Sequence, residues 1–258
     1  MKVYKKFVWL HIKSMMQYKT SFLLVTIGQF LVSFNLFLGI YFMFQRFHRV
    51  KGFEYEEVLL CFAINIMAYS VAEMFARGFD GFPTMLRNSE FDRVLVRPKG
   101  IMLQVLSSRF ELTRIGRMIQ AVVMFAYGIT HSNITWTLDK IVTVIFMLIG
   151  GIMLFSALFV LYAAVCFFTL EGIEVMNIVT DGAREFGKYP LGIYGKDILQ
   201  FSTFVVPYAL FQYYPLLYLL GRKSNPVYII LPLLTVFFFL PCLALFQFGI
   251  RHYKSNGS

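Results

Sequence analysis

Six long apolar stretches, separated by short charged segments, make up nearly the whole of this 258-residue chain. Five of them carry no charged residue, and the sixth, Val58–Ala76, carries only Glu73 near its end. A helix needs about 20 apolar residues to cross the hydrocarbon layer of a membrane, which is about 30 Å thick. The sequence therefore predicts an all-α integral membrane protein with six transmembrane helices. The expected spans are Ser21–Phe44, Val58–Ala76, Met118–Trp136, Ile141–Leu170, a fifth that begins near Ile198, and Val227–Phe248. The fifth contains Pro207 and Pro215, so we expect it to be bent or broken.

The composition leaves no room for a separate soluble domain. Hydrophobic residues make up 58% of the chain and charged residues 15%, whereas about a quarter of a soluble domain is charged. We therefore expect a single membrane domain over residues 1–258. The first apolar run is longer than that of a signal peptide, so we expect it to remain as the first span.

The distribution of basic residues predicts the topology. With a cytoplasmic N-terminus and six alternating spans, 18 of the Lys and Arg residues fall on the inside and 6 on the outside. This is the bias that cytoplasmic loops show, so both termini are expected in the cytoplasm and the chain in the plasma membrane. The inside set includes two joints, residues 77–117 and 171–197, and the second of these contains Lys188 and Lys196. Topology and anionic lipid explain the net charge of +10, so no nucleic-acid partner is expected.

The first 19 residues alternate basic and apolar positions. Val3, Phe7 and Leu10 recur at helical spacing, while the lysines fall largely elsewhere around the helix. This pattern predicts an amphipathic helix that lies on the cytoplasmic face of the membrane and contacts lipid.

The sequence lacks the groups that an intramembrane enzyme or metal site would need. All four histidines fall outside the spans or at their margins, and the three cysteines, each in a different apolar run, lack metal-binding spacing, which predicts packing roles for them. Glu73 is the one acid within a span that could couple ion movement to transport. Arg77 follows it by four residues, and an ion pair between them on a helix would screen the charge of Glu73. No GxxxxGK[ST] loop is present, so ATP-driven work would require a separate ATPase.

The joint at 77–117 is the longest hydrophilic segment. Gly78, Gly81 and Pro83 predict turns, followed by a short helix from about Thr84 to Asp92 with Thr84 as its N-cap. Because the residue before Pro98 resists helical geometry, that helix should end by about Val96. A second helix from Ile101 is expected to carry three arginines toward the membrane, namely Arg109, Arg114 and Arg117.

Two short motifs resemble a known family. The first is the segment 85–98, which reads MLRNSEFDRVLVRP, and the second is the segment 189–194, YPLGIY, with Val206-Pro207-Tyr208 inside the fifth span. In their order and spacing they resemble the permease subunits of type-2 ABC exporters, in the six-span subgroup formerly described as a domain of unknown function. The resemblance covers essentially the whole chain, which would then be a single exporter transmembrane domain.

The resemblance implies a division of labour between subunits. The permease would pair with a second permease, identical or paralogous. Two copies of an ABC ATPase would bind ATP and Mg²⁺. This chain would therefore bind no cofactor or metal and would have no catalytic residues. The joint after the second span would form a coupling helix, roughly Pro83–Arg97, whose apolar side could plug a groove on the ATPase. The residues expected to contact the ATPase are Met85, Leu86, Arg87, Glu90, Phe91, Asp92, Arg93 and Arg97.

The transport route is expected at the interface between the two permeases. The abundance of Phe and Tyr is compatible with a hydrophobic or amphipathic cargo. An ATP-independent channel or secondary carrier is the alternative interpretation, and an intramembrane enzyme is the third. The polar candidates for the pathway are Gln29, Ser33, Asn35, Asn65, Ser70, Glu73, Ser202, Thr203 and Gln212.

Overall fold

The computed structural model describes residues 2–132, 134–169, 182 and 185–254, and every regular element within these residues is a helix. The all-α prediction is therefore confirmed. The long helices are α1 (Lys2–Gln17), α2 (Lys19–Arg46), α3 (Tyr55–Asp80), α7 (Ile115–His131), α8 (Leu138–Thr169) and α14 (Val236–His252). The shorter elements are α4 (Phe82–Arg87), α5 (Glu90–Leu95), α6 (Ile101–Ser107), η1 (Leu112–Arg114), η2 (Leu191–Ile193), α10 (Lys196–Phe204), α11 (Tyr208–Phe211), α12 (Tyr213–Leu219), α13 (Val227–Ile230) and η3 (Leu231–Thr235).

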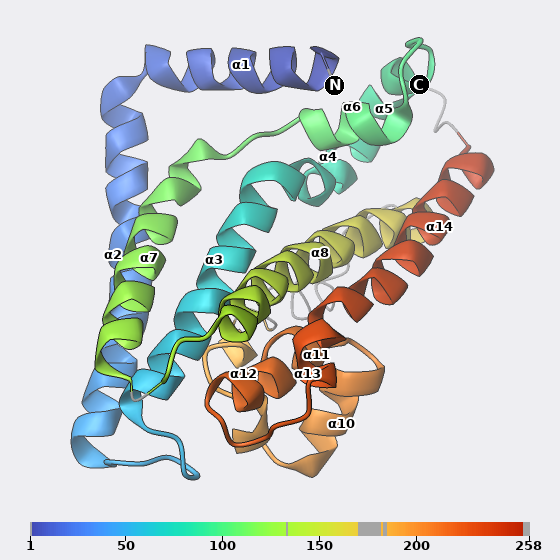
Figure 1. Ribbon diagram of the computed structural model, residues 1–258. Coiled ribbons are helices and arrows are strands. Elements are labelled where there is room, and N and C mark those ends of the chain that lie inside the picture. Colours follow the sequence, from blue (N-terminus) through green and yellow to red (C-terminus); the bar gives the residue numbers. More distant parts are fainter. Residues whose placement is uncertain (1, 133, 170–181, 183–184, 255–258) are drawn as a thin grey trace.

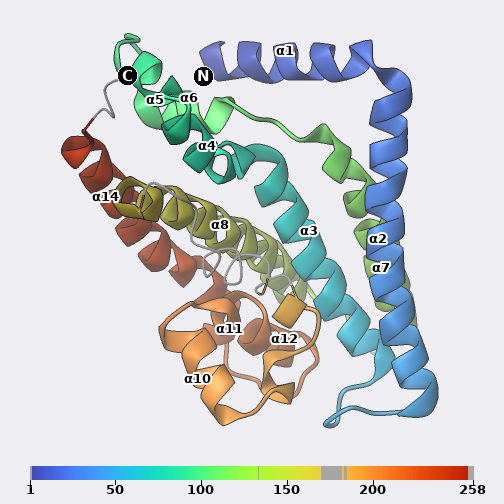
Figure 2. The same ribbon diagram turned by 180° about the vertical axis from the view of Figure 1, so that it is seen from behind.

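Five long helices lie side by side in the order α2, α7, α3, α8 and α14 (Figures 1 and 2). In the most apolar part of α3, 83% of the residues are buried inside the chain, against 11% in α2. The helix α3 therefore lies at the centre of the bundle. By contrast, α2 is an edge helix with an open apolar surface.

Both ends of the chain lie at the same end of the bundle (Figure 1). Here α1 runs across the bundle, and the chain turns at Tyr18 into α2. The helices α4, α5 and α6 lie at this end too (Figure 1). The segment that sequence analysis singled out therefore lies beside the two termini.

The six-span count is only partly matched by the described residues. Four helical segments are long and apolar enough to cross a membrane, namely Lys19–Arg46, Tyr55–Arg87, Leu138–Thr169 and Val227–His252. The expected third span corresponds to α7, whose 17 residues give a length of about 26 Å at 1.5 Å per residue. That length is slightly less than the hydrocarbon thickness.

The expected fifth span is broken into α10, α11 and α12. The sequence predicted a bend or break here because of Pro207 and Pro215, and the break is confirmed. Pro207 has no N–H to continue the helix from Phe204, so α11 starts afresh after it. These three helices gather at the end of the molecule away from the termini rather than crossing it as one rod (Figure 1).

The second joint differs from the expectation where it is described. Within residues 171–197, the segment 171–181 and residues 183 and 184, and with them Arg184, lie outside the described residues. The part that is described packs against the bundle, because a Cβ at Gly187 would collide with the side chain of Asn65 in α3. Lys188 is buried, and Lys196 begins α10 at the end away from the termini (Figure 1). Assigning Lys196 to the same side as the N-terminus was therefore wrong, because the break in the fifth stretch leaves α10 at the opposite end.

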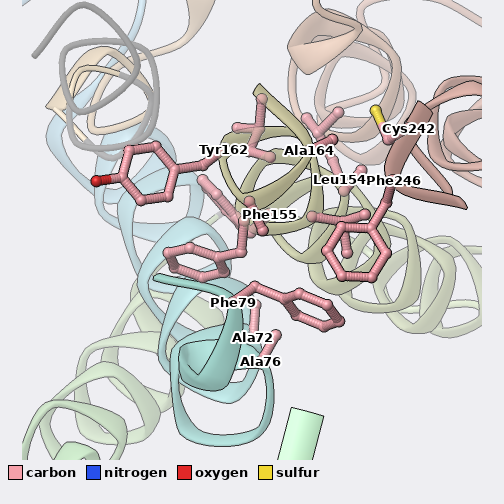
Figure 3. Packing of buried hydrophobic residues seen from close by; sticks show 14 of the residues in the cluster. Ala72, Ala76, Phe79, Leu154, Phe155, Tyr162, Ala164, Cys242 and Phe246 are labelled. Carbon is pink, nitrogen blue, oxygen red and sulfur yellow. The ribbon is translucent and has the colours of Figure 1, made fainter. Parts of the chain in front are cut away.

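The core between α3, α8 and α14 relies on small residues and aromatic rings. Figure 3 shows labelled side chains from all three helices converging, and the rings of Phe79 and Phe246 lie 5.4 Å apart in an edge-to-face arrangement. Glycine lets α8 and α3 approach closely, because a Cβ at Gly151 of α8 would lie 2.7 Å from the Cβ of Ala68 in α3. The predicted packing role of the three cysteines is confirmed, since all are buried and free.

Candidate functional site

A buried cluster of charges joins α3 to α7 at the end of the bundle that holds the termini. The carboxylate of Glu73 is 3% exposed. It accepts a hydrogen bond of 2.8 Å from Arg77 and one of 2.6 Å from Arg117, and the guanidinium of Arg114 lies 3.1 Å from it. Arg77 also pairs with Asp80 at 3.2 Å. One carboxylate thus holds three arginines.

Local structure explains how these residues meet. Glu73 and Arg77 lie one turn apart on α3, as the sequence predicted. Arg114 ends the 3-10 turn η1 and Arg117 lies in the first turn of α7, so the two lie three residues apart on one face. Sequence reasoning placed both on a helix near the membrane but missed their link to Glu73. The available signal was the lone acid in an apolar span, which requires buried cationic partners.

The cluster changes the interpretation of Glu73. Both carboxylate oxygens of Glu73 are occupied, because Arg77 and Arg114 contact Oε1 and Arg117 contacts Oε2. Such a group has a structural role, since its removal would leave the buried arginines without their anion. The geometry therefore favours a fixed joint between α3 and α7 over ion coupling at Glu73.

Immediately after α3 the chain forms a compact two-helix knob, which we define as residues 82–97. The predicted single helix from Thr84 to Asp92 is instead two helices, α4 and α5, separated at Asn88 and Ser89. Ser89 has a φ of 54°, a left-handed conformation that ends the first helix. Thr84 lies inside α4 rather than capping it, because the helix already begins at Phe82 with Pro83 in its first turn. The end of α5 at Leu95 agrees with the expected limit at Val96.

The apolar side of the knob faces the chain's own core. Phe91 is fully buried, and its ring lies 5.1 Å from that of Phe82, 5.5 Å from Phe167 and 5.0 Å from Tyr253. The expectation that this side plugs a groove on another subunit was wrong, because the same residues are needed to hold the knob on α8 and the C-terminal segment. The buried members of the predicted contact set are Leu86 and Phe91, and Met85 is partly buried against the same core.

The exposed surface of the knob is basic. The Arg93 side chain is 71% exposed and Val96 is 83% exposed, and Arg87 and Arg97 are exposed as well. Glu90 lies 3.9 Å from Arg93 at this surface. We refer to Arg87, Arg93, Val96 and Arg97 as the basic face.

The C-terminal segment fixes the knob from one side. Burial and a hydrogen bond with the carboxylate of Asp92 raise the pKa of Tyr253 above its usual value. Tyr253 also contacts the ring of Phe91. Asp92 therefore serves an internal contact, and the surface offered to a partner is carried by its basic neighbours.

The predicted pathway residues do not form one continuous set. Asn65 and Gln212 both contact the turn at residues 187–189. The Gln212 amide donates to the backbone oxygens of Gly187 and Tyr189, at 2.6 and 3.1 Å. Gly187 also packs against the side chain of Asn65. Thr203 donates to its own helix and lies 3.1 Å from the Tyr214 hydroxyl.

The remaining polar candidates are divided between two sides of the molecule, since α2 and α10 lie far apart in both views (Figures 1 and 2). Ser33, Ser70 and Ser202 are buried, Gln29 is half-buried and Asn35 is exposed.

Comparison with known families decides the identity of the fold. The family model described as ABC-2 family transporter protein matches residues 8–257, which include almost every element described above. The chain belongs to the ABC-2 transporter family. It is thus a membrane permease of an ABC transporter. No curated protein and no solved structure matches the chain.

The knob is connected to the most deeply packed part of the permease. It follows α3 directly, and α3 is the most buried of the candidate membrane-spanning helices. The ion cluster of Glu73 lies on the same helix, seven residues before its end at Asp80. Through Arg114 and Arg117, this cluster links α3 to α7.

Proposed function

We propose that this chain is the permease subunit of an ATP-driven exporter and that a separate ATPase subunit docks on the basic face. The observation that carries the proposal is the knob itself, a short rigid element anchored by buried rings and exposing three arginines and Val96. Membership in the ABC-2 family supports an ABC ATPase as the partner. ATP and Mg²⁺ would bind to that partner.

The anchoring suits mechanical coupling. A flexible loop would absorb a movement of the partner, whereas an element held by a buried aromatic cluster moves with the helices beneath it. The basic face would recognise an acidic surface, since surface arginines chiefly steer association and fix its orientation.

The proposed topology places the knob and both termini in the cytoplasm of a cell whose plasma membrane the permease crosses several times. The excess of Lys and Arg near the terminal end of the bundle supports this orientation. In this topology α7 completes a crossing together with η1, and the broken fifth stretch stays near the external side.

We further propose that a second permease, identical or paralogous, packs against α2. Large apolar side chains cover this edge helix, and Leu24, Leu31 and Phe42 are each more than half exposed. A hydrophobic or amphipathic cargo passing along that interface would meet Gln29 and Asn35, predicted pathway residues of α2 that are not buried within the chain. This part of the proposal rests on the open surface of α2 and on the family.

Charge reversal on the basic face tests the docking proposal. The double variant Arg93→Glu, Arg97→Glu is expected to reduce co-purification of the ATPase at least tenfold, because two attractive contacts become repulsive. Both side chains are exposed, so the yield and elution profile of the permease should stay unchanged. The measurement is the ATPase-to-permease ratio after affinity isolation from native membranes.

A matched control is available at the other end of the bundle. Arg46 ends α2 and Arg49 follows it, both are exposed, and Arg46→Glu, Arg49→Glu makes the same change in net charge. This control should retain the ATPase. Equal retention of the ATPase by both double variants would contradict docking on the basic face.

A further inference from the structure

An apolar groove of about 590 Å³ lies beneath α1, where the terminal helix crosses the bundle. On α1 the groove is lined by Tyr4, Val8 and Ile12, which recur every four residues and so share one face of the helix. Lys5 and Trp9, the next residues along, line its edge. Trp9 is 64% exposed, so the permease itself does not cover it.

The far wall of the groove comes from α3 and α6. Phe75 of α3 is 41% exposed, and Leu103 and Leu106 of α6 complete the lining. The ring of His11 ties α1 to α6, because its Nε2 lies 3.2 Å from the backbone oxygen of Ser107. The groove is therefore built from three helices held in a fixed relation.

Its position corresponds to the boundary between lipid headgroups and hydrocarbon. The membrane helix α2 begins at Lys19, two residues after α1 ends, so the proposed topology places α1 at the membrane surface. Phe75 lies five residues before the end of α3 at Asp80, on the membrane side of that end. An apolar groove at this depth opens to acyl chains.

Charge identifies the kind of lipid. Lys5 lines the groove, Lys6 and Lys13 are exposed on the same helix, and α1 contains no acidic residue. Exposed cations near a membrane surface attract anionic lipid. A ligand with an apolar tail and a phosphate head fits a groove with an apolar floor and a lysine at its edge.

We propose that the groove under α1 binds one acyl chain of an anionic phospholipid, with its phosphate at the Lys5 ammonium. This lipid would join α1 to α6 beside the knob. The proposal needs only the membrane location of the permease and not the identity of its ATPase or cargo.

Trp9 provides a direct probe. Of the two tryptophans, Trp136 lies between α7 and α8, so Trp136→Phe leaves Trp9 as the only reporter. The full chain would be placed in nanodiscs that contain phosphatidylglycerol or phosphatidylcholine with brominated acyl chains, which quench tryptophan. We expect half-maximal quenching at a several-fold lower mole fraction of brominated phosphatidylglycerol than of brominated phosphatidylcholine.

Two pairs of variants separate the groove from the general lipid surface. Lys5→Ala should remove the preference for phosphatidylglycerol, whereas Lys6→Ala, with the same loss of charge outside the groove, should keep it. Leu103→Phe should fill the groove and weaken quenching, whereas Leu10→Phe on an exposed position should not.

Three results would overturn the proposal. They are equal quenching by the two lipids in the Trp136→Phe chain, equal effects of Lys5→Ala and Lys6→Ala, and no quenching by either lipid, which would mean that a protein segment fills the groove. If Leu103→Phe fails to fold, the lysine pair alone decides, because both lysines are exposed.

Discussion

Replacing Glu73 by glutamine is expected to destabilise the folded permease by about 3–5 kcal/mol, the usual cost of removing one partner from a buried ion pair. The amide has nearly the shape of the carboxylate but no charge. Arg114 and Arg117, whose side chains are 12% and 6% exposed, would then lack the anion that compensates them. Thermal unfolding of the purified chain, followed by size-exclusion chromatography after heating, would measure the loss.

Glu54→Gln is the matched control for this variant. Glu54 also pairs with an arginine, Arg49, but the two side chains are 40% and 70% exposed. Exposed pairs contribute about 0–1 kcal/mol, so this variant should unfold close to the temperature of the unaltered chain. If Glu73→Gln were equally stable, the cluster would not be the joint between α3 and α7.

Replacing Phe91 by alanine is expected to cost about 3–5 kcal/mol and to loosen the knob, because a fully buried ring leaves a cavity behind. Its contacts with Phe82, Phe167 and Tyr253 would be lost together. Limited trypsin digestion can detect the local effect, since Arg87 and Arg93 are exposed cleavage sites within the knob. Cleavage at these two residues should become many times faster.

Val96→Ala offers the comparison for Phe91→Ala. Val96 follows α5 and is 83% exposed, so its truncation removes almost no packing. Trypsin should cleave the Val96→Ala chain at the same rate as the unaltered chain. Unchanged protection of Arg87 and Arg93 in the Phe91→Ala chain would show that the ring does not anchor the knob.

The sequence predicts those helices whose existence depends only on the length of an apolar run. The long uncharged runs predicted α2, α8 and the C-terminal helix through α14, and the alternation of basic and apolar residues predicted α1. Prolines predicted the break in the fifth stretch. They could not predict where the fragments go, because that depends on packing such as the contact between Gln212 and the turn at Gly187.

The candidate site was located by sequence but its orientation was not. The spacing of residues 82–97 predicted a short helical segment after α3, yet the apolar residues of such a segment can face either a partner or the chain's own core. Only the structure shows that Phe91 meets Phe167 from α8, 76 positions away in the chain. The ion pair of Arg117 with Glu73 could not be predicted from sequence for the same reason, because the two residues lie 44 positions apart in the chain.

The most direct test of the account is photo-crosslinking from the basic face in native membranes. A photoreactive amino acid in place of Val96, which is 83% exposed, would sit on the basic face, and one in place of Phe204, also 83% exposed, would sit on α10 at the other end. The account predicts that the Val96 position captures a subunit with a P-loop ATPase sequence and that the Phe204 position does not. Capture of that subunit from Phe204 alone, or from neither position in an actively exporting membrane, would contradict it.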